Sequence, residues 1–235
     1  RDGLRRPFYI RVAKFMELLT TFIQFILHLD QHLITLVQNY GMWIYAILFA
    51  IIFCETGLVV TPFLPGDSLL FVAGGVAAST AANGDNSMNV HVLVLLLIVA
   101  AFLGNLTNFY IGRYLGPRIF SKPRDSIFLK QAYLDRTQAF FVKHGGKTIV
   151  LSRFVPIIRT YAPFVAGIGN MPRSQFALFN IVGAVIWCGS LIYAGYFFGN
   201  LPWVKKNLSL VIIGIIILSF IPAIIEYFRS KAKAR

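Results

Sequence analysis

The sequence predicts an all-α protein that crosses a membrane several times. Of its 235 residues 57% are hydrophobic, and the mean hydropathy is +0.70. Only 13% of the residues are charged, whereas a soluble domain usually carries about 25%. The apolar residues form runs of about 20, which is the length that spans a bilayer core as a helix. The chain has room for roughly four to six such segments and their connections.

The net charge of +13 could suggest a nucleic-acid partner, but the placement of the basic residues argues against one. They lie in the flanks of apolar runs, at 1–14, 113–147 and 229–235. This is the bias expected of cytoplasmic segments, where basic side chains also contact anionic lipid head groups. We therefore expect no nucleic-acid partner, and we expect both termini to be cytoplasmic in a multi-pass protein.

The first part of the chain divides into an extension and one structural half. Residues 1–41 are expected to hold an N-terminal extension and, over 16–38, an amphipathic helix lying at the membrane interface, because polar residues return there at helical spacing. Residues 42–112 form the first half. It contains a broken, re-entrant loop at about 62–80 and a conventional span at 90–112.

The second part mirrors this arrangement after a basic connection over 113–146, which we place in the cytoplasm. Residues 147–199 form the second half, with a re-entrant loop at 148–168 and a span at 175–199. Residues 200–235 hold a last span and a basic tail.

Two stretches, 55–67 and 153–167, carry features that are costly in a membrane. Each contains two charges of one sign and two prolines, which break helices by removing an N–H and by steric clash. Charges and broken backbone in lipid are expensive unless they are buried in protein. We therefore expect the stretches to fold inward from opposite sides and to meet, as in transporters built from inverted repeats. No sequence identity between the halves is evident, so this pairing depends on the pattern of Pro, Gly and charge.

The first stretch leaves one alternative open. A helix over 67–80 should follow the break, with Asp67 or Ser68 as its N-cap. We expect one span, in the apolar run 42–62, to cross the membrane before this loop, which then enters from outside. Residues 42–80 could instead form one hairpin that enters and leaves on the same side, and the N-terminus would then lie on the other face of the membrane.

The charges of the two stretches form the candidate site. If the loops meet, Glu55 and Asp67 face Arg153 and Arg159. Arginine stays charged in a membrane and binds phosphate through two parallel hydrogen bonds, while a carboxylate removed from water takes up a proton more readily. Protonation of the acids could therefore release the arginines to an anionic head group. The alternative is a purely structural pair of salt bridges, but buried pairs are poor stabilisers compared with apolar packing.

Further polar residues of the apolar runs are candidate hydrogen-bond donors near the site, although ordinary packing would also explain them. They are Ser68, Asn105, Asn108, Thr160 and Tyr161. The sequence contains no nucleophile motif, phosphate loop or metal-ligand spacing, so we expect neither an enzyme nor a cofactor or metal.

Five motifs carry a resemblance to a known family. They are Phe53-Cys-Glu-Thr-Gly57, Phe63-Leu-Pro-Gly-Asp-Ser-Leu-Leu70, Gly112-Arg-Tyr-Leu-Gly116, Lys143-His-Gly-Gly146 and Arg153-Phe-Val-Pro-Ile-Ile-Arg-Thr-Tyr-Ala-Pro-Phe-Val-Ala-Gly167. Over roughly 40–228 the chain resembles the DedA family of bacterial inner-membrane proteins, which are relatives of the eukaryotic VTT-domain proteins.

The resemblance implies two re-entrant loops in an inverted repeat, and lipid transport across the bacterial inner membrane. Family members are implicated in flipping undecaprenyl phosphate or phospholipids in dependence on the proton motive force. It also implies that the acids at Glu55 and Asp67 and the arginines at Arg153 and Arg159 are the functional charges. Many relatives have an acid where this chain has Asn105, which speaks against a proton relay there.

The resulting expectation is a proton-coupled carrier of an anionic lipid, with undecaprenyl phosphate as the first candidate. The arginines would bind phosphate and the acids would couple to protons. The alternatives are a proton-coupled antiporter of small cations or drugs, a phospholipid scramblase or flippase, and a membrane scaffold that transports nothing. The glycines of the span at 175–199 would permit a homodimer.

Overall fold

The computed structural model is helical and contains no strand in the part of the chain that it describes. It describes residues 16–17, 20, 35–36, 39–58, 66–82, 84, 88–120, 145–207, 210–215 and 217, with the backbone only at 116–120, 156–157 and 205. The elements are α3 (Trp43–Gly57), α4 (Gly66–Ala82), α5 (Val90–Phe120), α7 (Lys147–Ser152), α8 (Pro156–Ile168), α9 (Arg173–Phe198) and α10 (Pro202–Lys206). The expected interfacial helix and the last span lie mostly outside the described residues.

The long helices α5 and α9 are each apolar enough to cross a membrane, over Val90–Leu115 and Arg173–Phe198. Asn89 caps α5, because its side-chain oxygen accepts hydrogen bonds from the backbone N–H groups of His91 at 2.9 Å and Val92 at 3.3 Å.

Helix α5 continues past residue 112, where the first span was expected to end, and reaches Phe120. Arg113 does not leave the fold as the start of a loop. Its guanidinium donates to the carbonyl oxygen of Met171 at 3.1 Å and lies 5.9 Å from the ring centroid of Phe109. Contacts within the fold therefore hold the first basic residue of the flank on the helix.

The first broken stretch separates α3 from α4. Helix α3 ends at Gly57, and Leu58 has an extended backbone. Residues 59–65, which include two of the prolines, lie outside the described part. The predicted N-cap at Asp67 or Ser68 is wrong, because α4 already begins at Gly66 and Asp67 lies in its first turn. A carboxylate in the first turn is stabilised by the positive end of the helix dipole.

The second broken stretch separates α7 from α8 at residues 153–155. Val155 is extended, with φ −120° and ψ 108°, and Pro156 takes the first helical position, where no backbone N–H is needed. Pro163 was expected to help break this stretch, but it lies inside α8 without ending it. The break therefore depends on one proline and on the extended residue before it.

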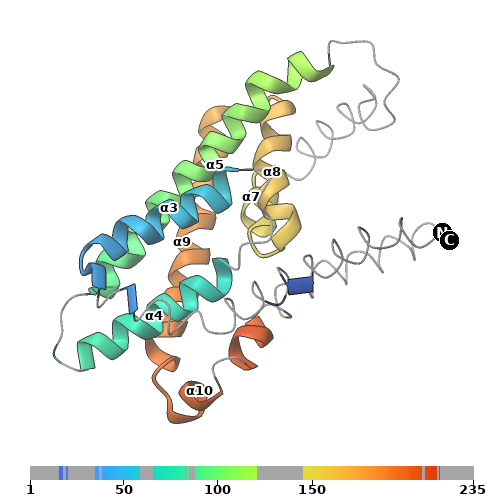
Figure 1. Ribbon diagram of the computed structural model, residues 1–235. Helices are drawn as coiled ribbons and strands as arrows, with labels where there is room; N and C mark the ends of the chain where they lie inside the picture. The colour runs from blue at the N-terminus through green and yellow to red at the C-terminus, as the bar shows by residue number, and fades with distance from the viewer. Residues whose placement is uncertain are drawn as a thin grey trace, which may run out of the picture.

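The short helices cross from one half of the chain to the other (Figure 1). Helix α4 of the first half packs on α9 of the second, and α8 of the second half packs on α5 of the first. Helix α5 also packs against α3 and α9, so it contacts helices of both halves.

The two crossings use the same contacts in the same register. The run Phe-Val-Ala-Gly occurs at 71–74 in α4 and again at 164–167 in α8. These runs face Gly195 of α9 and Gly112 of α5, where an added Cβ would overlap the carbonyl oxygen of the run's phenylalanine. In the same way, a Cβ on Gly74 would overlap the carbonyl oxygen of Ile192, and a Cβ on Gly167 would overlap that of Phe109. Each of these oxygens lies three residues before the glycine that the run faces. The halves thus share a short identity that the sequence analysis did not recognise.

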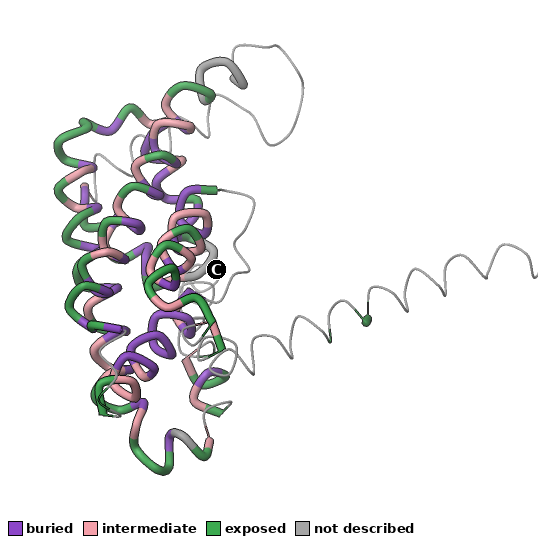
Figure 2. Tube along the Cα trace, turned by 60° about the vertical axis from the view of Figure 1, so that its left-hand side comes forward, coloured by how far each residue is buried: buried purple, intermediate pink, exposed green. Residues whose placement is uncertain are grey.

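Buried and exposed positions alternate along the helices of the bundle, including α5 and α9 (Figure 2). The exposed side chains on α9 include Leu178, Ile181, Val182, Val185 and Ile186. A helix that is apolar on its exposed face as well as its buried face suits a lipid environment.

Candidate functional site: a buried arginine and acid network

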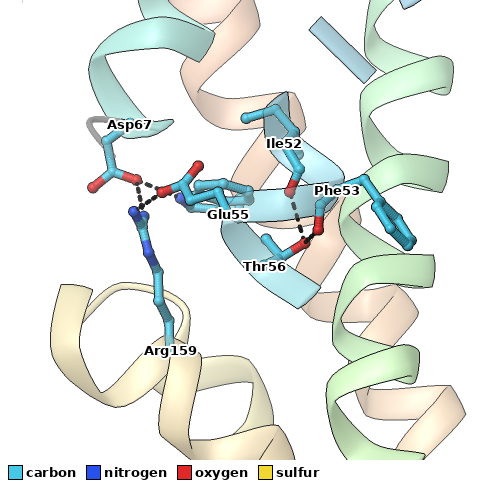
Figure 3. A network of polar contacts seen from close by, with 7 residues as sticks. Ile52, Phe53, Glu55, Thr56, Asp67 and Arg159 are labelled. Carbon is cyan, nitrogen blue, oxygen red and sulfur yellow. Dashed lines mark hydrogen bonds and ion pairs between the residues drawn. The ribbon is translucent and has the colours of Figure 1, made fainter. Parts of the chain in front are cut away.

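Arg159 of α8 lies between two carboxylates of the first half (Figure 3). Its Nη1 donates to Asp67 Oδ1 at 2.7 Å, and its Nη2 donates to Glu55 Oε1. Glu55 is in the last turn of α3 and Asp67 is in the first turn of α4, so three helix ends supply this cluster. Glu55 is fully buried, and Arg159 is 6% exposed.

The backbone at the start of α4 lies very close to the carboxylate at the end of α3. The Glu55 carboxylate lies against Gly66, the first residue of α4, and an added Cβ at Gly66 would overlap both carboxylate oxygens. Because glycine has no Cβ, the positive end of α4 can reach a buried acid directly. The break after α3 therefore positions Glu55 as well as interrupting the helix.

Trp187 of α9 completes the cluster. Its indole Nε1–H donates to Asp67 Oδ1 at 2.9 Å. Its ring centroid lies 5.3 Å from the guanidinium carbon of Arg159 and 5.9 Å from that of Arg153. The sequence analysis missed this residue. The available signal was its position in the middle of an apolar span, since tryptophan in membrane proteins gathers at the interfaces.

Arg153 does not join the acids, which corrects the expectation that two acids would face two arginines. It is 2% exposed, and its Nη2 donates to Asn180 Oδ1 at 2.6 Å and to the Ala101 carbonyl oxygen at 3.3 Å. Within the described part of the chain it contacts no carboxylate, and its Nε has no hydrogen-bond acceptor. The side chain leaves the end of α7 toward α5 and α9, where only neutral acceptors are available.

Two amides line the Arg153 site. With its amide oxygen turned toward Arg153, Asn105 accepts from Nη2 at 3.0 Å and donates to the Thr56 carbonyl oxygen at 3.3 Å. The hydrogen-bond partners determine this orientation. Asn180, which the sequence analysis did not single out, also donates to the Phe102 carbonyl oxygen at 3.0 Å. A neutral amide at position 105 therefore serves as a ligand of an arginine.

The remaining expected donors differ in their placement. Asn108 Nδ2 donates to the carbonyl oxygens of Thr160 at 2.7 Å and Thr56 at 3.4 Å, which ties α5 to α8 and α3. The Oδ1 of Asn108 and the Oγ of Ser68 are buried and have no partner among the described residues. Tyr161 is 46% exposed, in contrast to the buried Ser68, Asn105, Asn108 and Thr160.

The network is electrically balanced and largely buried. Two acids and two arginines have a formal sum of zero, and all four side chains are mostly or fully buried. The described residues contain no cluster of three or more His, Cys, Asp or Glu side chains that could hold a metal, and both cysteines are free thiols. Carboxylates and guanidinium groups held in this way can exchange hydrogen-bond and charge partners.

Comparison with known proteins identifies the family. Residues 64–197 match the VTT domain. The chain is 55% identical over 219 residues to Protein DedA of Escherichia coli strain K12, which covers 93% of this chain and 98% of that protein. The chain belongs to the DedA family. This confirms the resemblance stated from the five motifs.

Two further relatives bear membrane names. An uncharacterized membrane protein of Mycobacterium leprae is 43% identical over 186 residues, which is 78% of this chain and 80% of the relative. Inner membrane protein YqjA of Escherichia coli K12 is 35% identical over 187 residues, which is 80% of this chain and 81% of the relative. No solved structure gives a significant match. Together with the two long apolar helices, these relatives identify a membrane protein.

Proposed function

We propose that this DedA-family protein moves an anionic lipid across the bacterial inner membrane at the expense of the proton motive force, with undecaprenyl phosphate as the substrate. The observation that carries the proposal is Arg159, a buried guanidinium shared by carboxylates from two other helices. A phosphate presents oxygens in a geometry that the guanidinium fork binds equally well.

Protonation of the acids is the step that would exchange one partner for the other. A protonated Glu55 or Asp67 loses its charge and holds Arg159 less strongly, because a hydrogen bond between ions is about twice as strong as a neutral one. Arg159 then becomes available to a phosphate. When the proton leaves on the other side, the carboxylate competes for Arg159 again and releases the lipid.

Arg153 would provide the second contact for the phosphate. Its charge has no carboxylate partner among the described residues, and its Nε–H donates to no acceptor among them. Neutral amides and carbonyls already satisfy part of the guanidinium, so it can stay buried while no substrate is bound.

The proposal also takes the two halves to be an inverted repeat with two re-entrant loops. The matched crossings of α4 on α9 and of α8 on α5 support it. In transporters of this kind the substrate site lies near the middle of the membrane, between the repeats, and the halves move against each other. The arginine and acid cluster lies where the ends of α3, α4 and α8 meet, which suits such a site.

The antiporter alternative would require a cation to take the place that Arg159 occupies between the acids. Transport into proteoliposomes separates the two ideas. The labelled lipid is undecaprenyl phosphate, with an imposed pH gradient, and the variant is Arg159→Gln. The matched control is Arg173→Gln, which removes a guanidinium on α9 that lies over Tyr110 at 5.8 Å, outside the cluster.

We expect lipid translocation in the parent and in Arg173→Gln, and its loss in Arg159→Gln at unchanged yield of folded protein. Unchanged translocation in Arg159→Gln would contradict the phosphate role. Translocation that ignores the pH gradient would indicate a scramblase, and its absence from the folded parent would favour the antiporter or the scaffold.

A further inference from the structure

Trp187 is the residue at which the two arginine sites meet. Its ring lies within 5.3 Å of the Arg159 guanidinium carbon and within 5.9 Å of that of Arg153. The indole is 2% exposed and belongs to α9, whereas both arginines precede that helix in the chain. A cation near an aromatic face is attracted to it, more strongly when water is excluded.

The N–H at the edge of the same indole binds Asp67, an acid from the first half of the chain. Nε1–H donates at 2.9 Å to Asp67 Oδ1, and this oxygen also accepts from Arg159 Nη1 at 2.7 Å. Because an indole N–H can only donate, it favours a carboxylate oxygen that stays an acceptor. Trp187 therefore orients Asp67 toward Arg159, and it would keep hold of Asp67 if Arg159 moved away.

We propose that Trp187 is a positioning residue that couples the Arg153 site to the contact between Asp67 and Arg159. An anion on Arg153 lowers the net positive charge near the ring, and the same ring contacts Arg159 and, through its N–H, Asp67. A change at Arg153 is thereby transmitted to the ion pair. The inference rests on the proposed function only in taking that anion to be a lipid phosphate. The alternative is that Trp187 simply fills space between α4 and α9.

Fluorescence of Trp187 tests the contacts directly. The chain has three tryptophans, and the other two, Trp43 and Trp203, are 72% and 66% exposed. Trp43→Phe with Trp203→Phe leaves Trp187 as the sole tryptophan. In that protein Asp67→Asn, Arg153→Gln and Arg159→Gln should each shift the emission maximum. Arg113→Gln should not, because this guanidinium lies over Phe109 instead. An emission that none of the three substitutions shifts would overturn the positioning role.

Coupling is tested by a double-mutant cycle on thermal unfolding. Asp67→Asn and Arg153→Gln, alone and together, are placed in the parent, in Trp187→Phe and in Trp187→Leu. Residues that share a partner give non-additive effects, and separated residues give additive ones. We expect non-additive shifts of the unfolding midpoint in the parent, weaker coupling in Trp187→Phe, which keeps the ring but loses the N–H, and additive shifts in Trp187→Leu.

Equal coupling in all three backgrounds would leave Trp187 as a space-filling residue and overturn the inference. If Trp187→Leu does not fold, the comparison of the parent with Trp187→Phe still decides the outcome. The cycle needs no transport measurement. Coupling in a protein that does not translocate the lipid would keep this inference and contradict the proposed function, whereas translocation with equal coupling in all backgrounds would contradict this inference alone.

Discussion

At the scale of single residues, the structure gives the two arginines different surroundings. Arg159 is held by two carboxylates, while Arg153 is held by amide and carbonyl oxygens. A buried charge is costly when its partner is removed, and less costly when the whole charged group is replaced. For substitutions of Arg159 and of its two acids, the direction of the change in stability can therefore be predicted.

Arg159→Met should destabilise the protein by about 3–5 kcal/mol, because it leaves two buried acids without their guanidinium. Adding Glu55→Gln and Asp67→Asn to Arg159→Met should recover most of that loss, because no charge of the cluster then remains. Denaturant unfolding in detergent measures both. A triple variant less stable than Arg159→Met would show that the acids are stabilised by something other than Arg159.

Asn180→Asp tests the neutral surroundings of Arg153. The substitution keeps the shape of the side chain and turns the oxygen at 2.6 Å from Nη2 into part of a carboxylate. That carboxylate should compete with a lipid phosphate for Arg153, so transport of labelled undecaprenyl phosphate should fall while thermal stability stays equal or rises. Unaltered transport in a folded Asn180→Asp protein would remove Arg153 from the phosphate site.

At the scale of elements, the glycines at the two helix crossings determine how closely the halves approach. Gly195 and Gly112 face the carbonyl oxygens of Phe71 and Phe164, and neither leaves room for a Cβ. Small residues at such crossings are what allow membrane helices to pack backbone to backbone.

Gly195→Ala and Gly112→Ala should each destabilise the protein by about 1–3 kcal/mol, the usual cost of overpacking. Gly189→Ala is the matched control, since it lies on α9 with nothing within 4 Å of the added Cβ. It should be neutral, or stabilising by up to about 1 kcal/mol through helix propensity. Thermal unfolding in detergent compares the three. Similar losses at Gly195 and Gly112 support equivalent crossings, and a loss at Gly189 as large as theirs would show that the overlap is not the cause.

The sequence predicted the elements more accurately than their ends. The broken stretches were visible because Pro62, Pro65 and Pro156 interrupt apolar runs, and the polar residues within those runs were recognised as exceptional. The start of α4 was misplaced, and α5 continues beyond the residue at which the first span was expected to end. The sequence does not reveal the contacts found at these places, namely Gly66 against Glu55 and Arg113 against Met171.

The partners of the charges could be predicted only in part. Opposite signs on the two stretches pointed to Arg159 and the acids, but composition cannot assign which arginine meets which acid. Arg153 turns toward α5 and α9, and the residues that receive it, Asn180 and the Ala101 carbonyl, are revealed only by packing. Trp187 was missed because a tryptophan in an apolar run is equally consistent with ordinary packing.

At the scale of the whole molecule, the bundle is closed around a balanced set of charges. Arg159 belongs to the second half of the chain and its acids to the first, so the ion pairs join the two halves. A transporter needs such a contact to be reversible, and protonation of a carboxylate is a reversible way to weaken it.

The most direct test of this account is the dependence of lipid translocation on the pH gradient in the parent and in Glu55→Gln. Proteoliposomes with labelled undecaprenyl phosphate are measured with and without an imposed gradient, and Arg173→Gln serves as the control. We predict gradient-driven translocation in the parent and the control, and a response to the gradient that is lost in Glu55→Gln. Translocation by Glu55→Gln that follows the gradient as in the parent would contradict the coupling of protons to Arg159 through Glu55.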